Sequence, residues 1–283
     1  MNGYQGRKVL ITGGSSGIGR AAAIALARSG AHVAVAARDQ GRLDETVAAM
    51  RAVAGEGQRL GAVAVDVTDR ARVAQIPAEV LELLGGLDVL ICNSGYALPG
   101  YVDASPLENF DRMIDVNYMG HVNVVKAFLP HFLAQGAGHI SLVSSMLGFM
   151  SAFGYAAYSG SKYAIAGFAE ALRHELRPHG VQVSLYYPPT TKTPGLEREN
   201  ESKPAAVWAF ESESGWNKVY TPEQVAGSLL RSILGGRFEN MIGWDSWLLF
   251  FAFRLMPGLA RWMSDDELKK ANVKAAQARA KVE

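Results

Sequence analysis

A tyrosine and a lysine four residues apart are the side chains of this sequence best suited to proton transfer. Tyr158 and Lys162 stand in the run Tyr-Ser-Gly-Ser-Lys, and this spacing places both on one face of a helix. A phenol normally has a pKa of about 10, and a nearby ammonium group lowers it by favouring the phenolate. The pair therefore suits general acid catalysis, although the same spacing alone is also typical of a packed ring and a solvated amine.

A hydroxyl group precedes this helix at a place where ligands bind in open α/β sheets. Ser145 directly follows the apolar, strand-like segment His139 to Ser144. Side chains at the carboxyl end of a parallel strand face the ligand-binding crevice. Ser145 is therefore a candidate partner of the tyrosine, and the alternative is a strand-end hydroxyl that bonds the local backbone.

A glycine-rich turn near the N-terminus predicts a site for a dinucleotide pyrophosphate. The strand-like segment Val9 to Thr12 leads into the turn, and the alanine-rich, helix-like segment Arg20 to Ser29 follows it. Glycines let the backbone approach a pyrophosphate closely, and the helix N-terminus offers free N–H groups and the positive end of its dipole. The turn residues expected to meet the cofactor are Gly13, Ser15, Ser16, Gly17, Ile18 and Gly19.

Strand-like and helix-like segments alternate along the chain, which predicts a Rossmann-like, doubly wound α/β fold. Right-handed helical crossovers bring the carboxyl ends of parallel strands to one edge, where the glycine turn and Ser145 would meet. Capping boxes at Ser105 and Thr221 predict two helix starts. The seven expected strands lie near residues 9–12, 32–36, 62–66, 89–93, 139–144, 181–187 and 240–243.

From about residue 8 to 225, these motifs together resemble the short-chain dehydrogenase/reductase family. The family has an acid after the third strand, which meets the adenine ring, and a run Asn-Asn-Ala-Gly after the fourth. Asp66 matches the acid, and Cys92, Asn93, Ser94 and Gly95 match the run, with cysteine and serine in place of the first asparagine and the alanine. Neither change touches the proposed proton-transfer residues.

The resemblance implies a role for each residue of a catalytic tetrad. Tyr158 would donate a proton to a ketone oxygen that Ser145 holds, while hydride arrives from a nicotinamide. Lys162 would bind the nicotinamide ribose and lower the tyrosine pKa, and Asn117 would hold a water that relays protons. The implied catalytic residues are Asn117, Ser145, Tyr158 and Lys162, with no metal. The implied cofactor contacts beyond the glycine turn are Arg38, Asp66, Val67, Asn93, Ser94, Gly95, Tyr158, Lys162, Pro188 and Thr193.

The loop after the sixth expected strand departs from the family at one position. Pro188-Pro189 stands where the family usually has Pro-Gly, which bears on the loop beside the nicotinamide. Thr193 matches a threonine that bonds the carboxamide, and the alternative is an ordinary loop hydroxyl.

The end of the second expected strand predicts NADPH rather than NADH. NAD sites carry a carboxylate there for the ribose 2′-hydroxyl, and a carboxylate repels a 2′-phosphate. Ala37 occupies this position, and Arg38 follows with a guanidinium suited to bidentate phosphate binding. Asp39 would instead cap the next turn.

Length and composition are typical of one α/β domain with a short appendage. The chain has 283 residues, 49% of them apolar, and its net charge of +1 argues against a nucleic-acid partner. The single cysteine, Cys92, lies in an apolar segment, which predicts a core residue and no disulfide within the chain. Met1 to Arg7 is polar and shows no secretory signal, so we expect a cytoplasmic protein.

The chain after Thr193 is expected to shape the substrate site. Residues 1–243 would form the reductase domain, with a substrate lid at 195–220 that has no strong helix or strand pattern. The lid carries Trp208, Phe210 and Trp216 among charged residues. Aromatic side chains on such a lid are typical of an apolar ligand site.

An apolar segment at 244–263 precedes a charged helical tail at 264–283. Only the seven residues from Trp247 to Phe253 are uninterrupted by polar residues, far fewer than the ~20 that span a bilayer. Flanking tryptophans with Arg254 and Arg261 suit a membrane-interface segment or an oligomer contact. The remaining alternative is an ordinary buried C-terminal element.

Within the family, the segment Tyr186 to Gly195 and the acidic residues after it resemble the 3-ketodihydrosphingosine reductases. The resemblance implies NADPH-dependent reduction of 3-ketodihydrosphingosine to dihydrosphingosine in sphingolipid synthesis, a lipid-like ketone substrate, and peripheral contact with the inner face of a membrane. The alternatives are a reductase of a soluble ketone or of a 3-oxoacyl thioester, and a non-catalytic dinucleotide sensor. The sensor is disfavoured because Tyr158 and Lys162 are both present.

Two expected helices predict a homodimer or homotetramer. The segment Asn109 to Gln135 and the helix of Tyr158 carry apolar residues on more than one face, which a monomer would leave partly exposed. Related enzymes pair these helices across a two-fold axis.

Overall fold

A parallel sheet of seven strands organises the computed structural model, which describes residues 2–213 and 218–279. The strand order is β3-β2-β1-β4-β5-β6-β7, so the chain winds outward from β1 in one direction and then from β4 in the other. This order confirms the predicted Rossmann-like fold. The strands are β1 (Lys8–Thr12), β2 (His32–Ala37), β3 (Leu60–Ala64), β4 (Val89–Cys92), β5 (Gly138–Val143), β6 (Val181–Tyr186) and β7 (Glu239–Asn240).

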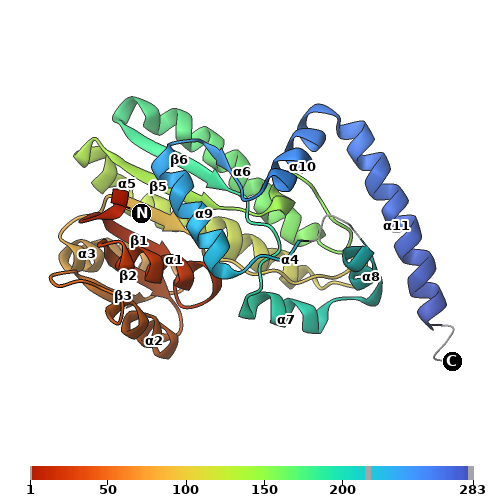
Figure 1. Cartoon of the computed structure of the whole chain (residues 1–283), viewed down its shortest axis with the longest axis horizontal. Coiled ribbons are helices and arrows are strands. Elements are labelled where there is room, and N and C mark those ends of the chain that lie inside the picture. The colour runs from red at the N-terminus through yellow and green to blue at the C-terminus, as the bar shows by residue number, and fades with distance from the viewer. Residues whose placement is uncertain (1, 214–217, 280–283) are drawn as a thin grey trace.

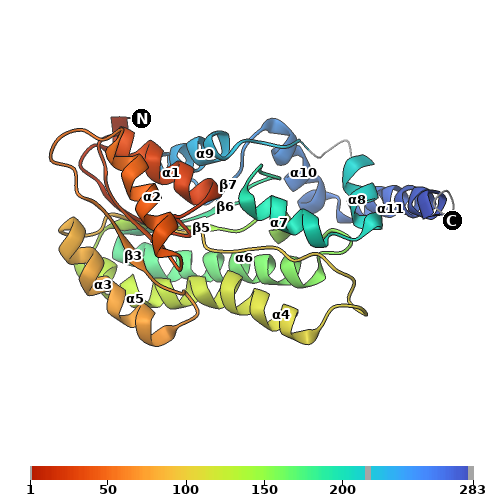
Figure 2. The ribbon, with the colours of Figure 1, turned by 90° about the horizontal axis from the view of Figure 1, so that it is seen from below.

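Helices cover both faces of the sheet (Figures 1 and 2). One face is covered by α1 (Gly17–Arg28), α2 (Gln40–Arg51) and α9 (Pro222–Gly235), and the other by α3 (Arg70–Leu84), α5 (Gly120–Gln135) and α6 (Ala156–Leu176). Short 3-10 turns lie at Asn2–Tyr4, Met146–Gly148 and Arg177–His179.

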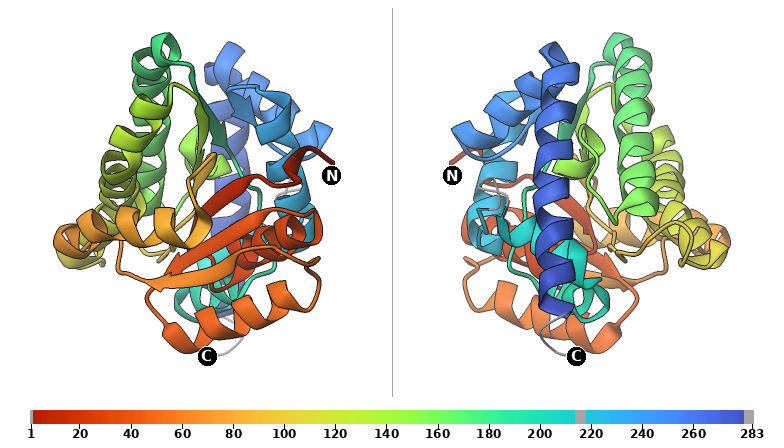
Figure 3. Two further views of the ribbon diagram at one scale, coloured as in Figure 1. Left: turned by 90° about the vertical axis from the view of Figure 1, so that its left-hand side faces the viewer. Right: turned by 90° about the vertical axis from the view of Figure 1, so that its right-hand side faces the viewer.

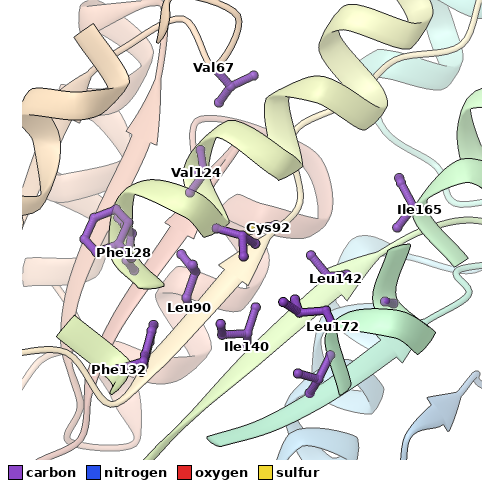
Figure 4. Close-up of a cluster of buried hydrophobic side chains, with 14 of the residues drawn as sticks. Val67, Leu90, Cys92, Val124, Phe128, Phe132, Ile140, Leu142, Ile165 and Leu172 are labelled. Carbon is purple, nitrogen blue, oxygen red and sulfur yellow. The ribbon is translucent and has the colours of Figure 1, made fainter. Parts of the chain in front are cut away.

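Alternation along the strands explains how two apolar cores form from one sheet. Val9 and Ile11 on β1 pack with the α1 and α9 side, while Leu10 between them packs with the α3 and α5 side. Figure 4 shows the second core, in which Phe128 of α5 lies over the strands. Burial on both faces is the reason that the strands are almost wholly apolar.

The predicted long helix at 109–135 contains a π-helical turn. It begins as α4 (Leu107–Met113), continues through the π-helical turn Ile114–Met119 and ends as α5. The predicted capping box at Ser105 is wrong: Pro106 is extended at ψ 145, so the helix starts one residue later without a side-chain cap. The box at Thr221 is confirmed, since Thr221 Oγ1 accepts from Gln224 N at 3.3 Å.

Four helices gather at one end of the molecule (Figures 1 and 2). They are α7 (Pro194–Ser202), α8 (Ala205–Glu213), α10 (Trp244–Leu255) and α11 (Pro257–Arg279). The lid predicted without strong pattern at 195–220 therefore contains two helices, and Trp216 lies outside the described residues. The expected boundary at 263/264 falls inside α11, which packs on α8 and α10 and crosses the end of the molecule (Figure 3).

One side of α10 packs into the core. Phe250 is 5% exposed and its ring lies 5.1 Å from the ring of Phe149 and 6.0 Å from that of Tyr187. Within residues 2–213 and 218–279, no helix combines the length and apolar character needed to cross a bilayer.

Candidate active site

A cavity of about 820 Å³ opens at the carboxyl ends of the strands and collects most of the predicted site residues. It lies where the winding direction of the sheet changes, between β1 and β4, which is the usual ligand crevice of such folds. Of the predicted residues, Gly19 and Asn117 do not line it. Those that do are Gly13, Ser15, Ser16, Gly17, Ile18, Arg38, Asp66, Val67, Asn93, Ser94, Gly95, Ser145, Tyr158, Lys162, Pro188 and Thr193.

The glycine turn leaves the N-terminus of α1 open toward the cavity. Gly17 has φ +52, a conformation that favours glycine, and the first turn of α1 carries no acidic residue. Ser16, the N-cap, makes no side-chain cap hydrogen bond. The free N–H groups and the positive helix dipole suit a pyrophosphate, so the turn fits a dinucleotide.

Gly19 serves close packing beneath the turn. A Cβ atom at Gly19 would lie 2.3 Å from the Gly13 carbonyl oxygen, so only glycine lets α1 pass this close. Asn93 holds the same turn, because its Nδ2 donates to Thr12 O at 3.2 Å and to Gly13 O at 3.3 Å. Gly19 therefore supports the turn from beneath, and Asn93 holds the turn through its Nδ2 while it also lines the cavity.

Two arginines lie at the end of β2. Arg38 is 66% exposed in its side chain and its Nη1 is 3.8 Å from Asp66 Oδ2. Asp39 caps α2 by accepting from Arg42 N at 3.1 Å, which confirms its predicted capping role. Arg42 also lines the cavity, and the sequence interpretation missed it although its place three residues after the cap was a usable signal.

The predicted adenine-binding acid forms a tight turn of its own. Asp66 lies beyond β3 rather than at its last position, and its Oδ1 accepts from Thr68 N at 2.9 Å and Thr68 Oγ1 at 2.8 Å. Val67 is fixed beside it, since Asn123 Nδ2 donates to Val67 O at 3.0 Å. The turn thus presents Asp66 and Val67 to the cavity wall.

Ser145 and Tyr158 both line the cavity, and the Ser145 hydroxyl is close enough to lower the pKa of Tyr158. Leu147 N donates to Ser145 Oγ at 3.2 Å, which orients the serine and leaves its proton available as a donor. Burial raises the pKa of Tyr158, and the hydrogen bond from Ser145 opposes that rise. Both side chains line the cavity, where their hydroxyl groups suit holding and protonating an oxygen atom.

Lys162 is buried behind this pair. Its Nζ donates to Val143 O at 3.3 Å and lies 5.6 Å from the centroid of the Tyr158 ring. Burial lowers the pKa of Lys162 to about 7. Burial is the largest influence on the pKa of Tyr158 and acts against the lowering expected from Lys162.

Asn117 lies directly behind the cavity wall, within the π-helical turn. Its Oδ1 accepts from Tyr96 N at 3.0 Å, and its Nδ2 donates to Tyr96 O and Ser161 Oγ, both at 2.9 Å. A Cβ on Gly95 would lie 3.1 Å from Asn117 Oδ1 and 3.2 Å from Lys162 Nζ. The asparagine side chain therefore fixes the wall behind the lysine.

A buried histidine supports this asparagine and was missed by the sequence interpretation. His121 Nδ1 contacts Asn117 O, and its Nε2 lies 2.8 Å from Cys92 O. Burial and the Lys162 charge lower the pKa of His121 to about 3. Cys92 is fully buried and burial raises the pKa of its thiol, so the predicted core role of Cys92 is confirmed.

The loop after β6 closes the cavity beside the turn. Thr193 Oγ1 accepts from Leu196 N at 3.1 Å and caps α7, and its Cγ2 is the atom that a Cβ on Gly17 would meet at 3.0 Å. Pro188 O accepts from Met146 N at 3.2 Å, which ties this loop to the residues after Ser145. The hydroxyl of Thr193 thus has a structural partner.

The far wall of the cavity combines apolar and charged side chains. Its apolar part comes from α10 and α11: Leu248, Leu249, Ala252, Phe253, Met256, Leu259 and Ala260. Its charged part includes Glu199 and Glu211, which both hydrogen-bond Tyr155. Residues this far apart in sequence give no local signal of their proximity.

Comparisons with known proteins agree with this geometry. A family model described as short chain dehydrogenase matches residues 7–204. A 3-dehydrosphinganine reductase of Danio rerio is 35% identical over 246 residues, 86% of this chain and 73% of its own. A protein of Mycobacterium tuberculosis described as an oxidoreductase, SadH, is 31% identical over 262 residues, 90% of this chain and 93% of its own. The crystal structure of a short-chain type dehydrogenase/reductase from Mycobacterium marinum matches with a TM-score of 0.75 and 29% identity, over 84% of this chain and 94% of that one.

The chain belongs to the short-chain dehydrogenase family. It is an oxidoreductase that acts on CH–OH and C=O groups with a nicotinamide cofactor. The open N-terminus of α1 and the hydroxyl groups of Ser145 and Tyr158 in one cavity are consistent with this activity.

Proposed function

We propose that this enzyme reduces a ketone to a secondary alcohol with NADPH, and that the ketone is 3-ketodihydrosphingosine. One observation carries the proposal: a single cavity joins the glycine turn, the Ser145–Tyr158 pair and the apolar walls of α10 and α11. The relative from Danio rerio is named for this substrate class. A long alkyl chain would lie along the apolar wall, because burial stabilises it by about 0.8 kcal/mol per methylene.

The catalytic roles follow from the positions of the hydroxyl groups. NADPH, when bound, supplies the hydride that reaches the carbonyl carbon. Ser145 donates a hydrogen bond to the ketone oxygen, and Tyr158 transfers its proton to that oxygen as the charge develops. The Lys162 ammonium group lies close enough to stabilise the Tyr158 phenolate that remains after proton transfer. The side chain of Asn117 packs beside Gly95 and Lys162 and fixes this part of the cavity wall.

The preference for NADPH is supported by the end of β2. Ala37 and Arg38 both line the cavity, and the nearest acid in sequence, Asp39, is engaged as the cap of α2. Arg42 adds a second guanidinium on the same wall. A 2′-phosphate would therefore meet two cations there, Arg38 at 3.8 Å from Asp66 and Arg42 at 3.5 Å from Asp39.

An apolar surface on α10 and α11 supports peripheral contact with a membrane. Its side chains are 48% to 79% exposed: Trp244, Leu248, Phe251, Leu255, Met256, Leu259 and Trp262. Leu248, Met256 and Leu259 also line the cavity, so the surface is continuous with the proposed path of the alkyl chain. Arg254 and Arg261 flank it and suit anionic lipid headgroups.

The test follows NADPH oxidation with purified enzyme and a panel of ketones. We expect turnover of 3-ketodihydrosphingosine with an affinity that rises with alkyl chain length. Faster turnover of short soluble ketones or of 3-oxoacyl thioesters would show that one of these, and not the lipid ketone, is the substrate. No turnover of any ketone would contradict the proposed reaction.

A further inference from the structure

A cluster of ionisable side chains from three helices forms the charged wall of the cavity. The hydroxyl oxygen of Tyr155, just before α6, lies 2.5 Å from Glu199 Oε1 of α7 and 2.6 Å from Glu211 Oε1 of α8, and its single proton is donated to one of them at a time. Lys203 Nζ lies 2.6 Å from Glu211 Oε2 and 3.4 Å from Glu199 Oε1. We call these four residues the carboxylate cluster.

The carboxylate cluster holds more negative than positive charge on the side that faces the cavity. Glu199 and Glu211 line the cavity, whereas Lys203 lies behind them with a side chain only 1% exposed. Arg198 also lines the wall and is exposed. Among the described residues, every hydrogen bond and ion pair of the Glu199 carboxylate falls on Oε1, which leaves Oε2 for a ligand.

Burial makes this arrangement costly without a further cation. The Glu199 carboxylate is only 17% exposed, and burial raises its pKa. A carboxylate in such a place is stabilised by an additional positive group. Lys203 supplies one such group from behind, Arg198 on the same wall is exposed, and the described lining residues of α10 and α11 carry no positive charge.

The carboxylate cluster adjoins the reacting groups. The Tyr155 ring centroid lies 6.3 Å from that of Tyr158, and the Glu199 charge is close enough to raise the pKa of Tyr158. A ketone oxygen held by Ser145 and Tyr158 would thus place the neighbouring atoms of the substrate near Glu199. In a 2-amino ketone the ammonium nitrogen is two bonds from the carbonyl carbon.

We propose that Glu199, with Glu211 beside it, binds the substrate's ammonium group and thereby selects ketones that carry a primary amine next to the reacting carbonyl. This inference rests on the proposed ketone reduction and adds the feature that separates a sphingoid base from other long-chain ketones. Lys203 keeps the two carboxylates together from behind, since its ammonium group contacts both. Glu199 is then a specificity-determining residue rather than a proton donor.

The test compares two ketones of equal length in wild type and in Glu199→Gln. One is 3-ketodihydrosphingosine, and the other is the same molecule with hydrogen in place of the amino group. We expect Glu199→Gln to lower the ratio of kcat/KM for the amino ketone over the deamino ketone by about 10- to 100-fold, as for loss of one charge-assisted hydrogen bond. Glutamine still accepts from Tyr155, so the fold is retained.

The matched control is Glu201→Gln, an exposed residue on the same helix that does not line the cavity. It should leave the ratio unchanged. Equal losses on both ketones in Glu199→Gln would assign Glu199 a structural role and overturn the proposal, as would an unchanged ratio.

A binding measurement keeps this inference separate from the proposed reaction. By calorimetry with the NADP⁺-loaded enzyme, dodecylamine should bind wild type more tightly than dodecanol, and Glu199→Gln should remove the difference. If no ketone is turned over but amine and alcohol still bind differently, the proposed reaction is wrong and the proposed ammonium site is supported. Equal binding of amine and alcohol by wild type would overturn the ammonium site.

Discussion

Replacing Tyr158 with phenylalanine removes one hydroxyl group from the cavity and leaves its walls in place. We expect Tyr158→Phe to lower kcat by about 100- to 10,000-fold, because the proton donor is lost. NADPH binding, measured by fluorescence titration, should change little, since the glycine turn and Arg38 are untouched. Turnover close to wild type would show that another group protonates the ketone.

The buried charge of Lys162 is predicted to lower the free energy of unfolding. Its pKa falls from 10.5 to about 7, so between these values the folded chain binds fewer protons than the unfolded chain. Its contribution to stability therefore rises as the pH increases through that window and is most unfavourable below pH 7. Lys162→Met should raise the free energy of unfolding near pH 6 by on the order of a few kcal/mol.

Thermal unfolding at pH 6 and pH 10 measures this effect, with Lys126→Met on the exposed side of α5 as control. The gain from Lys162→Met should shrink at the higher pH. A lower Tm at pH 6 would mean that the hydrogen bond to Val143 O outweighs the cost of the buried charge.

Cofactor choice is a third prediction for single residues. Ala37→Asp combined with Arg38→Ala should move the kcat/KM ratio of NADPH over NADH toward NADH by about 100-fold, because a phosphate contact is lost and a repelling carboxylate is added. Arg38→Ala alone should have a smaller effect, since Arg42 remains on the same wall. Equal use of both cofactors by wild type would contradict the interpretation of this strand end.

Among the elements, α10 has two sides with different predicted roles. Phe250 packs against Phe149 and Trp247 in the core, so Phe250→Ser should lower the free energy of unfolding by about 3 kcal/mol or more. Phe251, the next residue, is 49% exposed, and Phe251→Ser should have a much smaller effect. Chemical denaturation of the two variants measures the difference, and similar losses would contradict the structure of α10.

The exposed side of α10 and α11 is predicted to hold the protein at a lipid surface. Leu255→Ser with Trp262→Ser should reduce co-sedimentation with anionic liposomes several-fold while the turnover of a short ketone is retained. The control is Leu107→Ser on α4, which is 76% exposed but lies outside the cavity. Unchanged sedimentation would remove the support for peripheral membrane contact.

The sequence predicted those elements that are determined by residues close together in the chain. The apolar strand segments, the glycine turn and the Thr221 cap were all visible in this way. The helices α7 and α8 were not, because α7 is largely polar and charged, α8 has apolar residues without a clear stripe, and contacts such as that of Tyr155 with Glu199 hold them in place. The Ser105 prediction failed because Pro106 adopts an extended conformation.

Within the whole molecule, pairing of two chains is the expected state in solution. The outer surfaces of the α4–α5 segment and α6 expose Ile114, Leu133 and Tyr163 by 36% to 43%, and pairing of two chains would cover these apolar side chains. Light scattering at micromolar concentration should therefore give at least twice the chain mass of 30.4 kDa. The mass of a single chain would contradict this prediction.

The site is less visible from sequence than the fold because tertiary contacts assemble it. The tetrad could be predicted from motifs, but the part played by His121 depends on contacts with Asn117 and Cys92 that only the folded chain makes. The carboxylate cluster likewise joins residues 155 and 211, and the cavity wall joins residue 13 to residue 260. Neither pair shares a local pattern.

The π-helical turn at Ile114–Met119 makes this enzyme sensitive to the number of residues in one helix. A π-helical turn holds one residue more than an α-helical turn, so deleting a single residue there would restore a regular helix. The deletion would leave α4 and α5 in nearly the same relative orientation, because the π-helical turn absorbs the extra residue, and it would shift Asn117, inside that turn, relative to Gly95 and Lys162. A chain shortened by one amino acid could thus fold around the same sheet and still lose the register of its catalytic wall.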